Sequence, residues 1–188
     1  APGAGFDPHQ HADMEIVTWV LEGALDHRDS AGNEGTIVPG LAQRMSAGRG
    51  ITHSEANHSD TERVHVVQMW VAPDERCIEP DYEQVDVNDR LDAGGLVPVA
   101  SGRGHDGAIA IRQGDAVMWV GRLTDGETVE VPVAPFVHLY VARGSVVLDG
   151  TRLGEGDAAR LTDAGGLGLR STGDSEVIIW ETHREAIR

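Results

Sequence analysis

The chain has 188 residues, 15 basic and 31 acidic, and a formal net charge of −16. Direct contact with nucleic-acid phosphates requires a basic surface, so we expect no direct nucleic-acid binding. No apolar run reaches the length of a transmembrane helix and no signal-like leader opens the chain, so we expect no membrane association. Cys77 is the only cysteine, which excludes an internal disulfide and favours the cytoplasm.

The first half of the chain begins with a histidine-rich stretch and continues as short apolar runs between turn signals. If Pro8–Glu15 is a β-strand, alternate residues place His9, His11, Asp13 and Glu15 on one face. Gly- and Val-rich sequence of this kind predicts an all-β protein. The further strand candidates of this half are residues 14–21, 24–28, 36–38, 51–55 and 64–71, and residues 43–45 lead into a tight loop at residues 47–50.

Residues 72–95 are polar and acidic, and we interpret them as an interdomain linker with little core of its own, which could run along the surface of the first domain. Short strands resume after it, and helix signals are scarce. One apolar-charged-Gly-apolar pattern, residues 19–25, recurs at residues 139–147, which indicates a duplicated β-barrel. The strand candidates of the second half are residues 96–100, 108–112, 116–120, 127–131, 137–142, 145–148, 158–161 and 177–181.

A second pair of candidate ligands is formed by His53 and Glu55, again at i and i+2, so a strand would place both on one face. His9, His11, His53 and Glu55 together would bind one divalent metal ion per chain. Three imidazoles and a carboxylate suit Fe²⁺, and also Zn, Cu, Ni, Mn or Co. Structural zinc sites are usually closed and rich in cysteine, so an open set of this kind indicates catalysis or sensing.

The order of these motifs resembles the pirin family. The resemblance rests on Pro8–His11 with Glu15, and on Trp19–Gly23, His27–Asn33 and Met45–Glu55. It implies two tandem cupin (jelly-roll) barrels, which we place at residues 1–85, metal-binding, and 86–188, metal-free. Because family members carry further residues before the first histidines, we expect the N-terminal barrel to lack its first strands in this numbering. Carried onto this chain, the family's ligands are His9, His11, His53 and Glu55, with Fe²⁺ as the native ion.

The carboxylate ligand is contested, because cupins in general take it from the position of Glu15. Within the pirin pattern we favour Glu55, with Glu15 as an outer partner of the ligating histidines. His27 is interpreted as a structural residue beside Asp26 and Asp29. The remaining histidines up to His138 and the thiol of Cys77 are interpreted as having no role in the centre. The Gly-rich loop at residues 47–50 precedes no helix and is not a phosphate loop.

The resemblance implies an enzyme that cleaves a flavonol such as quercetin at its 2,3-bond with O₂, with Glu55 or Glu15 accepting the substrate proton. The alternative is a non-enzymatic, iron-dependent redox sensor that acts through a protein partner. A third hypothesis is a metal that only stabilises the barrel. Five side chains could line an apolar cavity, although the core is the favoured place for each: Met14, Trp19, Met45, Met69 and Trp70.

Overall fold

The computed structural model describes residues 1–184 and confirms an all-β chain with one short helix. It divides into two compact units. The first comprises Ala1–Val87 together with a returning segment, Ile109–Gly114, and the second comprises Asn88–Ala108 and the chain from Asp115 onward. The expected division after residue 85 placed residues 109–114 in the second domain, whereas the structure packs them with the first.

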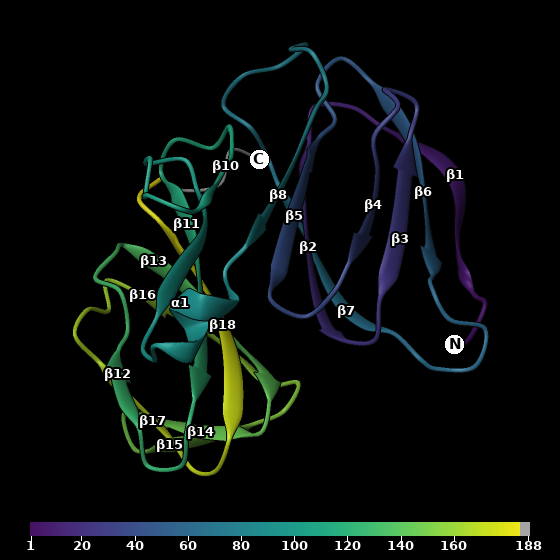
Figure 1. Ribbon diagram of the computed structural model, residues 1–188. Coiled ribbons are helices and arrows are strands. Elements are labelled where there is room, and N and C mark those ends of the chain that lie inside the picture. The colour runs from purple at the N-terminus through teal and green to yellow at the C-terminus, as the bar shows by residue number, and fades with distance from the viewer. Residues whose placement is uncertain (185–188) are drawn as a thin grey trace. The chain divides into compact units, whose positions relative to one another are not determined.

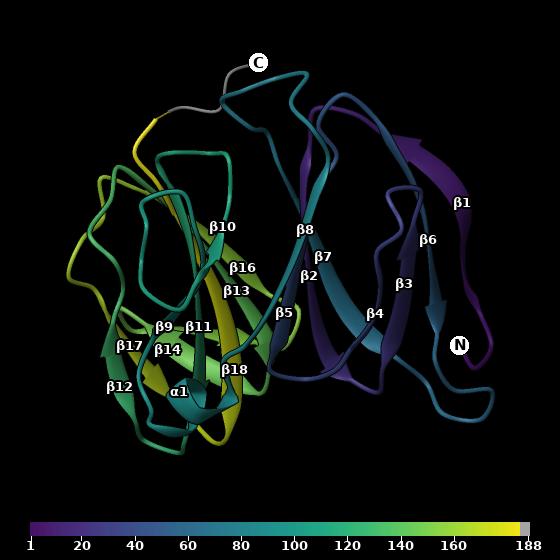
Figure 2. The same cartoon turned by 45° about the horizontal axis from the view of Figure 1, so that its top comes forward.

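The first unit consists of two antiparallel sheets that face each other (Figures 1 and 2). The strand orders are β1-β6-β3-β4 and β7-β2-β5-β8. The strands are β1 (Gly5–His11), β2 (Glu15–Glu22), β3 (Leu25–Asp29), β4 (Glu34–Ile37), β5 (Leu41–Ser46), β6 (Ile51–Asn57), β7 (His65–Val71) and β8 (Asp81–Asp86), with the two-residue β10 (Ile109–Ala110) in the returning segment.

The second unit repeats this plan with additional strands. One sheet contains the order β9-β11-β18-β13-β16, and the other has the order β12-β17-β14-β15. Its elements are α1 (Asn88–Asp92), β9 (Val97–Ser101), β11 (Ala116–Leu123), β12 (Thr128–Glu130), β13 (Phe136–Arg143), β14 (Ser145–Leu148), β15 (Thr151–Gly154), β16 (Ala158–Thr162), β17 (Gly168–Ser171) and β18 (Ser175–Thr182).

The predicted duplication is confirmed by the matching strand orders, in which β1 corresponds to β12 and β2–β7 to β13–β18. Gly23 and Gly144 occupy the same place, where the chain passes from one sheet to the other. Both have positive φ, +76° and +71°. A Cβ at Gly23 would lie 2.5 Å from the Arg63 carbonyl oxygen, and one at Gly144 would lie 2.3 Å from that of Asp174. Only glycine fits either crossing.

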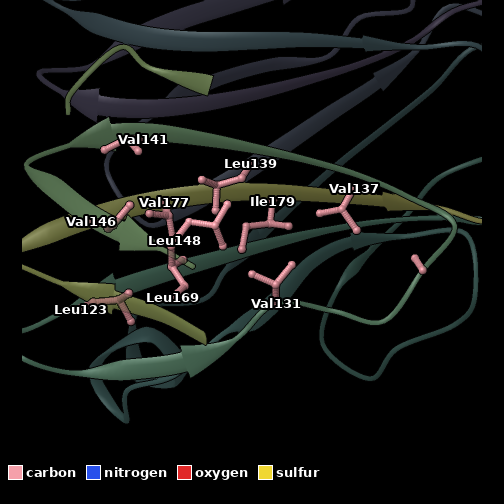
Figure 3. Packing of buried hydrophobic residues seen from close by; sticks show 11 residues of the cluster. Leu123, Val131, Val137, Leu139, Val141, Val146, Leu148, Leu169, Val177 and Ile179 are labelled. Atoms are coloured by element: carbon pink, nitrogen blue, oxygen red, sulfur yellow. The ribbon is translucent and has the colours of Figure 1, made fainter. Parts of the chain in front are cut away.

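The second unit encloses an apolar core between its sheets (Figure 3). Leu139 and Ile179 from one sheet point toward Leu148 and Leu169 from the other, and all four are buried. This core is a continuous packing of branched aliphatic side chains, which gives the unit its own hydrophobic stabilisation.

Two expectations from the sequence are wrong. The stretch from Pro8 to Glu15 is not one strand, because β1 ends at His11 and β2 begins at Glu15. Between them Asp13 has φ +50° and its carboxylate accepts a hydrogen bond from the Cys77 N–H at 2.7 Å. This left-handed residue ends the alternation on which the shared face of His9, His11, Asp13 and Glu15 depended.

The second correction concerns residues 72–95, which are not a bare linker. Strand β8 pairs with β5 along its whole length, from Leu41↔Asp86 to Ser46↔Asp81. Val87 and Leu91, which follow it, are fully buried. The strand was missed because β8 is an edge strand whose residues are mostly polar and half-buried.

Candidate metal centre

Strand pairing brings the four predicted ligands together from two neighbouring strands of one sheet, β1 and β6, and places His27 of β3 beside them. His9 on β1 is directly opposite His53 on β6. Glu55, two residues further along β6, is opposite His27 on β3. Alternation along β6 buries His53 and Glu55 and turns the intervening Ser54 outward. The i, i+2 spacing seen in the sequence therefore does place these side chains on one face.

His9, His11 and His53 form a close cluster of imidazoles. One ring nitrogen from each lies within 4.8 Å of the others. The Nε2 atoms of His9 and His53 are 3.0 Å apart. Ring centroids are separated by 4.4 Å for His9 and His53 and by 5.0 Å for His11 and His53. Three imidazole nitrogens converging in this way form a donor set for a transition metal.

Glu55 belongs to a second, overlapping cluster with His53 and His27, also within 4.8 Å. The Gln68 side-chain amide donates to Glu55 Oε2 at 2.7 Å. Glu55 Oε1 has no hydrogen-bond partner among the described residues. The His27 Nδ1 atom is 3.8 Å from that oxygen, which is within ion-pair distance but too long for a hydrogen bond.

Unsatisfied buried polar atoms concentrate at this place. Within the part of the chain that the structure describes, His11 Nε2, His53 Nδ1 and Glu55 Oε1 are buried without a hydrogen-bond partner. Such atoms are rare in folded proteins, because each carries a desolvation cost that no partner offsets. Neutral imidazole nitrogens and a carboxylate oxygen can all donate to a cation, so these residues fit a bound metal ion.

The electrostatics of the cluster favour protonation states suited to metal binding. Burial lowers the pKa of His53 to about 4, although the charge of Glu55 opposes this, and repulsion from the neighbouring histidines adds to the lowering. Burial also lowers the pKa of His11. At Glu55 burial raises the pKa, but interactions with His27 and Gln68 outweigh it and the net pKa is lowered. Metal ligands must be deprotonated, as these groups are near neutral pH.

Glu15 has different surroundings from Glu55. It lies buried on β2, where its Oε2 atom accepts hydrogen bonds from the Ser46 hydroxyl at 2.9 Å and from the Arg112 N–H at 3.1 Å. It belongs to neither cluster of candidate metal donors among the described residues. The structure therefore groups Glu55, and not Glu15, with the histidines.

His27 is the residue of this region that the sequence did not identify as part of the centre. It contacts Asp29 through Nε2 at 3.4 Å, and its ring stacks on Tyr82 with centroids 5.0 Å apart. Its other nitrogen faces Glu55. The available signal was alternation, because Leu25, His27 and Asp29 are the buried residues of β3.

The other side chains considered lie elsewhere or at the margin. His58 is exposed and pairs with Asp26 at 3.0 Å. Trp19 and Met45 are fully buried in the core, as expected. Trp70 is 59% exposed, and its ring meets that of His11 edge to face at 5.0 Å.

The repeated sandwiches and the histidine-rich centre in the first of them define a two-domain cupin. The pirin family profile matches residues 1–71, and a quercetinase C-terminal cupin domain matches residues 98–182. A Mycobacterium tuberculosis protein, named only provisionally as a quercetin 2,3-dioxygenase, is 56% identical over 184 residues, which cover 97% of this chain and 75% of that protein. The chain belongs to the pirin family.

Two further relatives extend the comparison. The quercetin 2,3-dioxygenase of Escherichia coli K12 is 38% identical over 181 residues, covering 95% of this chain and 77% of that protein. The crystal structure of the bacterial pirin YhhW from Escherichia coli in complex with nickel(II) superposes with a TM-score of 0.88. It is 35% identical and covers 97% of this chain and 79% of that one. Among the described residues, no helix is long and apolar enough to cross a membrane.

Proposed function

We propose that this chain is a metal-dependent dioxygenase that cleaves a flavonol such as quercetin at its 2,3-bond. The observation that carries the proposal is the convergence of three imidazoles with a buried, unpartnered carboxylate oxygen in a pirin fold. The names of the 38% identical relative and of the matched C-terminal domain support the reaction. We also propose the cytoplasm as its location, since Cys77 is an exposed free thiol that a reducing compartment preserves.

We propose that His9, His11, His53 and Glu55 hold the ion and that it is Fe²⁺. The nickel(II) complex of a family relative supports a divalent metal in this fold. A mixed set of imidazoles and one carboxylate leaves coordination positions open on a six-coordinate ion, which is typical of non-haem iron oxygenases. When bound, the ion supplies Lewis acidity that lowers the pKa of a hydroxyl group on the substrate.

The side chains around the donors have roles of their own. Glu55, which is itself one of the four donors, is also the proposed acceptor of the flavonol hydroxyl proton, because a carboxylate beside the substrate hydroxyl can act as a general base. Phe6, 62% exposed, contacts His9 edge to face at 6.4 Å, and Trp70 contacts His11 in the same way. These two exposed aromatic rings flank the histidines, and aromatic faces of this kind bind flat aromatic molecules.

The decisive experiment combines metal analysis with a flavonol assay. Protein purified without added metal is analysed for bound elements, and the Fe²⁺-loaded protein is incubated with quercetin and O₂ while the flavonol absorbance is followed. We expect loss of the flavonol with the unmodified protein and not with His53→Ala. Equal rates in the two would overturn the proposed dioxygenase, and absence of iron from the purified protein would overturn the proposed ion.

A further inference from the structure

A buried chain of polar contacts runs from the turn after β3 into the candidate centre. It begins at Asp29, whose Oδ1 atom accepts hydrogen bonds from the backbone N–H groups of Ala31 at 2.9 Å and Asn33 at 3.0 Å. The Asn33 side-chain amide donates to Asp29 Oδ2 at 2.9 Å. The Asp29 carboxylate is therefore fixed by its own turn before it meets any part of the centre.

His27 is the next member of this chain. Its side chain is fully buried, with Nε2 3.4 Å from Asp29 Oδ2 and Nδ1 3.8 Å from Glu55 Oε1. The ring is also held flat against Tyr82, at an interplanar angle of 30°. An imidazole between two carboxylates, with one face against an aromatic ring, has little freedom to rotate.

Glu55 is the last member of this series of contacts, with a hydrogen bond to one carboxylate oxygen and an imidazole within ion-pair distance of the other. Gln68 donates to Oε2 from the opposite sheet, and His27 faces Oε1 from the neighbouring strand. We propose that His27 is a positioning residue of the metal centre, which transmits the fixed orientation of Asp29 to Glu55 and so sets the direction of the metal-binding oxygen. This inference rests on the proposed metal centre.

The second unit offers an internal comparison. His27 lies four residues after the crossing glycine of the first unit, and Leu148 lies four residues after that of the second, so the two positions correspond. His27 is opposite Glu55 on the paired strand, and Leu148 is opposite Leu169. The pair is therefore polar in the unit with the histidine cluster and apolar in the other, where it forms part of the core shown in Figure 3. His27 and Glu55 differ from their counterparts together, as expected of two residues that act as a pair.

The test is metal binding and spectroscopy on the protein of residues 1–188 with Co²⁺ as the probe, since the visible absorption of Co²⁺ depends on the number and arrangement of its ligands. Residues that orient a metal ligand typically change metal affinity about 10- to 100-fold when removed. We expect His27→Phe, which keeps a ring to stack on Tyr82, to weaken Co²⁺ binding by about this factor and to change the visible spectrum. His58→Phe is the matched control, because His58 is an exposed histidine that pairs with Asp26.

A Co²⁺ affinity and spectrum of His27→Phe equal to those of the unmodified protein would overturn the inference. If His27→Phe does not fold, His27→Asn and His27→Gln replace it, because Asn keeps a nitrogen near the Nδ1 position and Gln keeps one near Nε2. The Asn variant should then bind Co²⁺ more tightly than the Gln variant, and equal affinities would overturn the inference. His9→Ala separates the two proposals, because unchanged Co²⁺ binding there would overturn the metal centre itself.

Discussion

Glu15 and Glu55 are both buried carboxylates of the first unit, and their partners distinguish what each contributes. Glu15 accepts two hydrogen bonds that join β2, β5 and the returning segment. Glu55 has one oxygen held by Gln68 and the other facing imidazole nitrogens. A carboxylate that accepts neutral hydrogen bonds from two other segments stabilises the fold, whereas one with an unpartnered, buried oxygen is available to a cation.

Exchange of each carboxylate for an amide should separate these roles. We expect Glu15→Gln to lower the free energy of unfolding by about 1–3 kcal/mol, because an uncharged amide oxygen accepts the two hydrogen bonds more weakly than a carboxylate oxygen does. Its metal affinity should be unchanged. Glu55→Gln should weaken metal binding, since an amide is a poorer ligand than a carboxylate. Urea unfolding of the metal-free proteins measures the change in stability, and isothermal titration with Ni²⁺ measures the change in metal affinity. If Glu15→Gln weakens Ni²⁺ binding and Glu55→Gln does not, Glu15 is the ligand.

The metal-free protein should lose stability in mild acid because of His53. Its pKa in the folded protein is about 4, below its ordinary value of 6.5, chiefly because of burial. Between these values the unfolded chain holds a proton that the folded chain lacks, so stability rises with pH in this window. The contribution is complete above about pH 6.5 and is lost as the pH falls toward 4.

The measurement for this prediction is urea unfolding of the metal-free protein at about pH 7.5 and about pH 5. We expect the free energy of unfolding to fall between these conditions, and to fall less in His53→Gln, where the titrating group is absent. The same decrease in both proteins would exclude His53 as the cause.

Residue-level prediction from the sequence succeeded where strand alternation was intact. The i, i+2 rule placed His53 and Glu55 on one face, and β6 is regular from Ile51 to Asn57. The rule failed at Asp13, whose left-handed backbone is stabilised by a hydrogen bond from the Cys77 N–H. Cys77 is distant in the sequence, so the residues around Asp13 do not reveal that the alternation ends there. The rule also did not identify His27 as part of the centre, because His27 and Glu55 are neighbours only through the pairing of β3 with β6.

At the scale of elements, one buried cation holds an edge strand and the returning segment to the first unit. The Arg44 side chain on β5 donates to Asp81 and Glu83 of β8 at 3.0 and 3.1 Å, and to the Ala110 carbonyl oxygen at 3.0 Å. Its guanidinium has several donors in a fixed plane, so a single residue can join three segments. This arrangement explains how a polar, acidic stretch such as β8 is ordered without a large apolar face.

Replacement of Arg44 should loosen these segments selectively. We expect Arg44→Met to lower the free energy of unfolding by about 1–3 kcal/mol, a loss that solvent limits because both carboxylates are partly exposed. Hydrogen exchange should accelerate in residues 81–86 and 109–114. Arg28→Met is the matched control, since Arg28 and Glu34 form an exposed pair and such pairs contribute about 0–1 kcal/mol. Unchanged exchange in β8 would exclude this role for Arg44.

Elements with an apolar alternating face were predictable, and polar edge strands were not. Strands β2, β7, β11, β13 and β18 all fall where apolar runs predicted them. Four of them, β2, β11, β13 and β18, lie inside a sheet with buried side chains, whereas β7 is an edge strand whose apolar residues are mostly half-buried. Strands β8 and β15 lie at sheet edges and β17 is short and Gly-containing, so their sequences carry little of this signal. Whether these strands form depends on pairing with strands that are not apparent from their own sequences.

At the scale of the whole molecule, the same strand plan occurs twice with different contents. The repeat was visible in the sequence because the crossing glycines, Gly23 and Gly144, are fixed by close backbone approach in both units. The side chains that face each other between the sheets were harder to predict from the sequence, because they depend on which residues are opposite one another on paired strands. The first unit places His27 opposite Glu55, and the second places Leu148 opposite Leu169.

This difference predicts which of the two units binds a metal ion and is stabilised by it. Titration with Ni²⁺ should saturate at one equivalent, because every cluster of three or more candidate donors among the described residues lies in the first unit. At a free metal concentration of about 100 times Kd, binding linkage stabilises the folded state by about 2.7 kcal/mol. That stabilisation should slow hydrogen exchange in β1 and β6, which supply the donors, and in β3, which carries His27. It should leave β12, β14 and β17 unchanged, because these strands carry no member of a cluster of candidate donors among the described residues. His53→Ala should abolish the slowing of hydrogen exchange by Ni²⁺. If the unmodified protein binds a second equivalent of Ni²⁺ and His53→Ala still binds it, a metal site lies outside the first unit.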